Sequence, residues 1–139
     1  MTTTATQQRW KLTVFIDSVN TGTWDKKSGG DVTAAETKYR PGGMAPEKSI
    51  GGPASVSNVT ASREYILERD HAAAKRWLSR VGRARVTVHQ HALDADGVPR
   101  GKPFTYRGVL QKVSIPDADS TATGVSMLEI EVSTDGTVD

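Results

Sequence analysis

The chain has 139 residues and no cysteine, which suits a single domain and excludes disulfides, a thiolate metal site and a cysteine nucleophile. Its 18 basic and 16 acidic residues give a net charge of +2, too balanced for a dedicated nucleic-acid binder. We expect neither a signal peptide nor a membrane span, because no apolar run has the length or the flanks that these segments need.

The first nine residues are polar and rich in threonine, so we expect residues 1–9 to form a flexible N-terminal arm. The pattern then changes, because the apolar Trp10, Leu12, Val14 and Ile16 alternate with mostly polar residues. This period of two predicts a strand with one buried face. Phe15 lies on the opposite face, where it packs either under a loop or in an interface.

The segments 24–27 and 31–38 predict a second strand, broken by a bulge or bend at Ser28-Gly29-Gly30. Residues 39–53 (YRPGGMAPEKSIGGP) contain four glycines and three prolines, which predicts a long loop. Long loops in small domains are usually functional or disordered. We therefore expect this loop to pack on a neighbouring subunit, through Arg40, Pro41, Gly42, Gly43, Met44, Ala45, Pro46, Glu47 and Ile50.

A third strand region covers residues 56–67 and precedes one short amphipathic helix. The spacing of Ala73, Trp77 and Val81 predicts the helix, with Asp70 as its N-cap and Gly82 as its C-cap. Alternation then predicts strands at residues 84–90, 104–115 and 125–133. In the last strand Leu128, Ile130 and Val132 face inwards, whereas Met127, Glu129 and Glu131 face outwards.

About six strands and one helix predict a mainly β fold, an antiparallel β-sandwich or partly closed barrel over residues 10–136, flanked by the helix. A monomer of this kind leaves open sheet edges, which invite pairing with another chain. A ring that continues the sheet from one subunit to the next would remove those edges.

The sequence motifs for metal binding and catalysis are weak. His89 and His91 share one face of a strand and His71 lies apart, so we expect solvated histidines and no metal site. The Asp94-Ala95-Asp96-Gly97 run departs from a calcium loop and predicts a turn. Neither a nucleophile elbow nor a phosphate-binding loop is present. We therefore expect no cofactor and no enzymatic activity.

A cluster of basic residues follows the helix into the next strand: Lys75, Arg76, Arg80, Arg83 and Arg85. This cluster could bind phosphate groups. The one aromatic residue in this run, Trp77, belongs to the apolar face of the predicted helix, so we favour a solvated helix end with salt bridges to neighbouring acids.

Several short motifs follow one another along nearly the whole chain. They are residues 39–47 (YRPGGMAPE), Gly51-Gly52, 58–60 (NVT), 75–78 (KRWL), 81–84 (VGRA), 93–97 (LDADG) and 127–131 (MLEIE). In this order they resemble the tail tube proteins of long-tailed, siphovirus-like bacteriophages. The Tyr-Arg-x-Gly-Gly pattern also occurs in the wider group of tail and injection tubes.

The resemblance implies a virion protein with the tail-tube fold, assembled in the host cytoplasm into hexameric rings. The rings would stack into a hollow tail tube for DNA passage, without specific DNA binding and without membrane insertion by this chain. Tape-measure, tail-tip or terminator proteins would be partners. The N-terminal arm would help to stack rings, through Thr2, Thr3, Thr4, Gln7 and Gln8.

Such conduits are expected to have a lumen that does not hold DNA tightly. Glu129 and Glu131 are candidate lumen acids, although Arg107 and Lys112 are equally placed by pattern. The alternatives are a ring-forming tail completion or baseplate-hub protein, the inner tube of a contractile injection system, and a monomeric β-sandwich binding module.

Overall fold

The structure is a computed structural model that describes residues 4–6, 9–121 and 123–139. It contains one helix, α1 (Leu67–Arg80), within these residues. The strands are β1 (Trp10–Ile16), β2 (Val19–Trp24), β3 (Lys26–Gly29), β4 (Val32–Tyr39), β5 (Lys48–Val56), β6 (Val59–Glu64), β7 (Arg85–Leu93), β8 (Pro99–Ser114) and β9 (Met127–Val138). In this part of the chain, no helix is long and apolar enough to cross a membrane.

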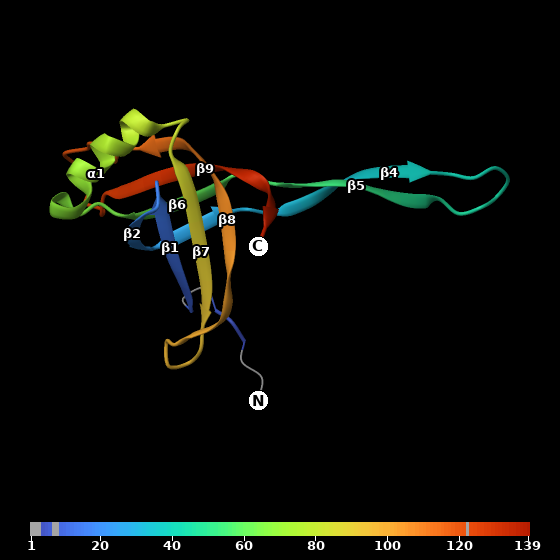
Figure 1. Ribbon diagram of the computed structural model, residues 1–139, viewed down its shortest axis with the longest axis horizontal. Coiled ribbons are helices and arrows are strands. Elements are labelled where there is room, and N and C mark those ends of the chain that lie inside the picture. Colours follow the sequence, from blue (N-terminus) through green and yellow to red (C-terminus); the bar gives the residue numbers. More distant parts are fainter. Residues whose placement is uncertain (1–3, 7–8, 122) are drawn as a thin grey trace.

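Seven strands form one curled antiparallel sheet in the order β2-β1-β7-β8-β9-β6-β3. Figure 1 shows β1, β7 and β8 running across β6 and β9, with α1 at one end of this body. Strands β4 and β5 form a separate two-stranded sheet that projects from the body. The predicted fold class, mainly β and antiparallel with one flanking helix, is therefore confirmed.

The core lies on the concave side of the curled sheet. The alternating residues Leu12, Val14 and Ile16 of β1 are buried, as predicted. So are Leu128, Ile130 and Val132 of β9, each with no exposed surface. Helix α1 contributes Ala74 and Trp77 to the same cluster, and it thereby covers one end of the core.

Helix α1 begins earlier than predicted. Its N-cap is Ile66, whose side chain cannot accept a hydrogen bond, and Asp70 lies inside the first turn. The Asp70 carboxylate instead accepts a hydrogen bond from the backbone N–H of Ile66 (2.9 Å) and is fully buried. The C-cap is Val81, one residue before the predicted Gly82, and Gly82 follows with a φ of +83° that suits glycine.

The predicted loop over residues 39–53 is shorter than expected. Strand β4 continues to Tyr39 and β5 begins at Lys48, so only residues 40–47 are irregular. Gly52 and Pro53 fit in β5 because the β4–β5 register shifts near Ala35, and a two-stranded sheet has free edges that tolerate proline. A Cβ at position 52 would lie 2.8 Å from the Ala35 Cβ, so glycine allows this close approach.

Candidate assembly site

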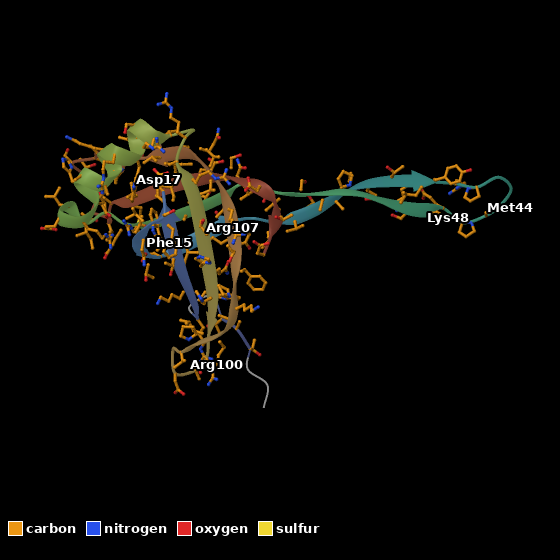
Figure 2. The ribbon with its side chains drawn as sticks, viewed as in Figure 1. Phe15, Asp17, Met44, Lys48, Arg100 and Arg107 are labelled. Carbon is orange, nitrogen blue, oxygen red and sulfur yellow. The ribbon has the colours of Figure 1, made fainter. Side chains whose placement is uncertain are left out.

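Strands β4 and β5 form a long hairpin that leaves the body of the protein (Figure 1). Every residue of the two strands is exposed except Val56 at the base, which is partly buried. Figure 2 shows Met44 and Lys48 at the far end of this projection. The hairpin thus presents both of its faces and both of its edges beyond the body.

The base of the hairpin is fixed to the body. The Thr134 hydroxyl of β9 donates to the backbone oxygens of Val56 (2.9 Å) and Ser57 (3.0 Å). The Ser57 hydroxyl accepts from the backbone N–H of Asp31 (2.9 Å), and the Ser57 N–H donates to the Asp31 oxygen (2.9 Å). These bonds set the direction in which the hairpin leaves the domain.

The hairpin exposes apolar side chains from its base to its tip, which the rest of the described residues leave uncovered. Met44 is fully exposed, and Val32, Tyr39 and Ile50 are each more than half exposed. An isolated two-stranded hairpin is at best marginally stable in water. Its predicted contact residues Arg40 to Glu47 occupy the connecting turn, whereas Ile50 lies on β5 opposite Thr37.

Glu129 and Glu131 lie two residues apart on the outward face of β9, as predicted. On that face Glu131 pairs with Thr60 of β6 and Lys112 of β8, and it accepts a hydrogen bond from the Asn58 side-chain amide (3.0 Å). The candidate lumen acids therefore share one surface, and Lys112 lies beside them. A role in lining a lumen stays a prediction.

The outward face of β1, β7 and β8 is less polar than expected. Phe15 packs edge-on against His89, with ring centroids 5.4 Å apart, rather than under a loop. The His89 Nδ1 lies 3.0 Å from the Thr105 hydroxyl, and both side chains are largely or partly buried. Burial, together with the nearby charges of His91 and Arg107, lowers the pKa of His89.

The described residues include no group of three or more His, Asp or Glu side chains placed to hold a metal ion. Of the predicted stacking arm, Thr2, Thr3, Gln7 and Gln8 lie outside the described residues, and Thr4 is exposed.

A buried ion pair that the sequence did not reveal joins α1 to the sheet. The Arg63 guanidinium of β6 donates to the Asp70 carboxylate (2.7 Å), and these side chains are 2% and 0% exposed. Arg63 also donates to the Thr21 backbone oxygen and lies over the Trp24 ring, 4.4 Å from its centroid. The only signal in the sequence was a carboxylate at the start of the helix, which we interpreted as an N-cap.

Asp70 is surrounded by donors. Besides Arg63, it accepts hydrogen bonds from the Arg69 guanidinium and from the Ile66 backbone N–H. Burial by itself raises the pKa of this carboxyl, but the hydrogen bonds and the charges of Arg69 and Arg63 outweigh it. The pKa of Asp70 therefore lies below its usual value, and the carboxylate stays ionised inside the protein.

Comparisons with known proteins find a shared fold. No family model matches the sequence, and no curated protein matches it. The whole chain aligns with 96% of a chain in the anti-feeding prophage (AFP) baseplate, a 6-fold symmetrised cryo-EM structure, with 15% identity and a TM-score of 0.76. It also aligns with 93% of a chain in the AFP tube-terminating cap, with 14% identity and a TM-score of 0.73.

A third similar structure is the extended sheath–tube complex of the extracellular contractile injection system PVC. There, 98% of this chain aligns with 90% of that chain, with 14% identity and a TM-score of 0.70. The sequence resembled tail tubes of long-tailed phages, whereas these structures are parts of the anti-feeding prophage and of an extracellular contractile injection system. These comparisons show that the chain shares its fold with these structures.

Proposed function

We propose that the chain is a structural subunit that assembles with copies of itself into hexameric rings, and that the rings stack into the hollow tube of a tail or tail-like injection particle. The observation that carries this proposal is the projecting hairpin β4–β5. It is anchored at its base and exposes apolar residues along its length, so it gains stability when another subunit covers it.

Two further observations support the proposal. The likeness to subunits of tube-bearing particles extends over nearly the whole length of both chains, and one of those structures is described as 6-fold. The strands at the edges of the seven-stranded sheet, β2 and β3, also offer backbone groups for continuing the sheet into a neighbour. The role is structural rather than catalytic, and DNA or another cargo would pass through the lumen.

The test is negative-stain electron microscopy of the purified protein over a range of concentrations, together with analytical ultracentrifugation. We expect hexameric rings at low concentration and hollow tubes with a regular axial repeat at high concentration. A protein that sediments as a monomer throughout this range would contradict the proposal and favour a monomeric binding module.

A second candidate is a ring that closes or completes a tube, because the fold is also similar to a chain of a tube-terminating cap. In that case the same experiment gives isolated rings that never stack. The main proposal of stacked rings also includes the predicted contact residues of the hairpin and the stacking role of the N-terminal arm. It includes tape-measure and tail-tip proteins as partners.

A further inference from the structure

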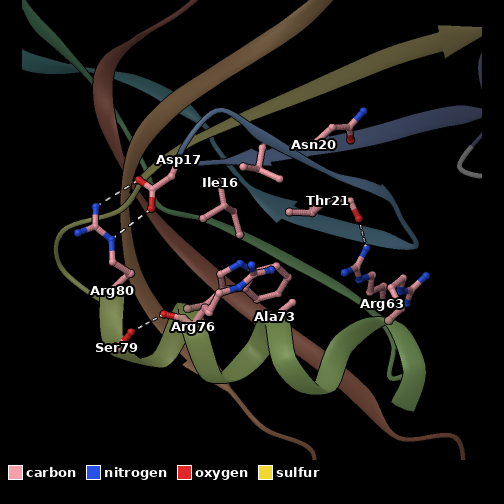
Figure 3. Close-up of a pocket in the computed structure, with 12 residues that line it drawn as sticks. Ile16, Asp17, Asn20, Thr21, Arg63, Ala73, Arg76, Ser79 and Arg80 are labelled. Atoms are coloured by element: carbon pink, nitrogen blue, oxygen red, sulfur yellow. Dashed lines mark hydrogen bonds and ion pairs between the residues drawn. The ribbon is translucent and has the colours of Figure 1, made fainter.

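A groove of about 490 Å³ lies between α1 and the β1–β2 turn. Figure 3 shows Ala73 on the helix side of this groove and Ile16 on the strand side. Trp77 also lines it, next to Ala73. The groove therefore has an apolar floor that α1 and β1 build together.

Four arginines line the same groove: Arg63, Arg69, Arg76 and Arg80. Arg63 and Arg69 share the carboxylate of Asp70, and Arg80 pairs with Asp17 (3.2 Å). Arg76 is exposed and forms no ion pair in the part of the chain that the structure describes. The groove consequently carries an excess of positive charge beside apolar surface, which suits a segment with both acidic and aliphatic side chains.

Such a segment exists in the turn between β7 and β8. Asp94 organises this turn, because its Oδ1 accepts from the backbone N–H groups of Asp96 (2.9 Å) and Val98 (3.0 Å). Its Oδ2 accepts from the Arg100 guanidinium (2.9 Å). Asp96 and Val98 are then held at the surface, with Val98 half exposed.

The turn and the groove lie at opposite ends of the same strands. In the β1–β7 register, Trp10 pairs with Ala92 next to the turn, and Ile16 pairs with Val86 next to the groove. Figure 2 shows the same separation, with Asp17 near α1 and Arg100 at the other end of β7 and β8. Copies that follow one another along this direction bring the turn of one copy to the groove of the next.

We propose that residues 94–98 of one copy dock in the arginine-lined groove of the copy in the next ring, with Asp96 facing Arg76 and Val98 on the apolar floor. This inference rests on the proposed ring-forming function and adds a contact between rings. The contact joins two different surfaces, so it is heterologous and does not close on itself. It therefore propagates along an open stack.

Charge reversal tests the contact. Arg76→Glu and Asp96→Lys should each raise the concentration needed for tube formation at least about tenfold, because each places like charges together. Rings should persist. The double variant should restore tubes, whereas Lys75→Glu, which makes the same change beside the groove but not in it, should leave tubes unaffected. Normal tubes from Arg76→Glu, or no restoration in the double variant, would overturn the proposal.

Disulfide trapping separates this contact from the proposed function. The chain has no cysteine, so Arg76→Cys with Asp96→Cys introduces only the intended pair. Under mild oxidation we expect covalent ladders, and few from the control pair Lys75→Cys with Asp96→Cys. If the wild type forms no tubes but the test pair still links selectively in concentrated protein, the tube function fails and the contact stands. Equal linking by both pairs overturns the contact, whatever the wild type assembles into.

Discussion

At the scale of single residues, the pair of Arg63 and Asp70 decides how α1 sits on the sheet. Asp70→Asn should lower the free energy of unfolding by about 3–5 kcal/mol, because Arg63 is left as a buried charge without its counterion. Urea denaturation, followed by the fluorescence of Trp24 and Trp77 near Arg63, measures the change.

The matched control is Asp17→Asn, which removes the exposed pair with Arg80. It should cost less than about 1 kcal/mol, since exposed ion pairs contribute little. Equal losses in the two variants would show that Asp70 does not anchor the helix as we describe.

Acid should weaken the same contact. The pKa of Asp70 is lower in the folded protein than the usual value of about 3.9 for an unfolded chain. The stabilisation is therefore complete above the unfolded pKa and is lost as the pH falls through the folded pKa. Between about pH 5 and 3, the stability of the wild type should fall more steeply than that of Asp70→Asn, whose amide does not titrate. If the free energy of unfolding falls equally steeply with pH in the wild type and in Asp70→Asn, the lowered pKa of Asp70 would be contradicted.

At the scale of elements, the hairpin β4–β5 should be dispensable for folding but not for assembly. Ala34 and Ala54 are Cα partners, so residues 35–53 can be replaced by an Asn-Gly turn that closes a short hairpin. We expect a folded monomer with a free energy of unfolding within about 1 kcal/mol of the wild type, because the removed residues lie outside the core.

Near-ultraviolet circular dichroism and ultracentrifugation measure these two properties of the shortened variant. Met44→Ser should weaken assembly with the hairpin still in place, whereas Lys48→Gln, beside the same turn but outside the predicted contact residues, should not. Tubes formed by the shortened variant would exclude the hairpin as an essential contact.

Strands of the body could be predicted because one face is buried and the other is not. Val14 and Ile130 each alternate with outward residues, and burial fixes such a period of two. In the hairpin, β4 agrees with the strand predicted at residues 31–38, but β5 was missed, since neither of its faces is buried and its glycines and proline resembled a loop. The Arg63–Asp70 pair escaped prediction for a different reason: the partners lie on separate elements, and only the packed fold brings them together.

At the scale of the whole molecule, charge is distributed unevenly along a nearly neutral chain. All 18 Lys and Arg residues precede residue 113, whereas six of the 16 Asp and Glu residues follow Lys112. Basic residues also gather on α1 and the segment after it, and the acidic Asp96 lies at the other end of the strands. Opposite charges at different places on one subunit favour ordered contacts between copies over random ones.

High salt should therefore distinguish the two contacts that we propose, which are the charged contact between rings and the apolar contact of the hairpin. The Debye length falls from about 10 Å at 0.1 M salt to about 3 Å at 1 M, so exposed charge pairs weaken while apolar contacts persist. We expect 1 M NaCl to dissolve tubes into rings, because the 94–98 turn and its groove are held largely by charge whereas the hairpin presents Tyr39, Met44 and Ile50. Sedimentation at both salt concentrations measures the two populations. Tubes that resist 1 M salt would mean that apolar surface holds the rings together, and the loss of rings as well as tubes would mean that charge also holds the hairpin contact.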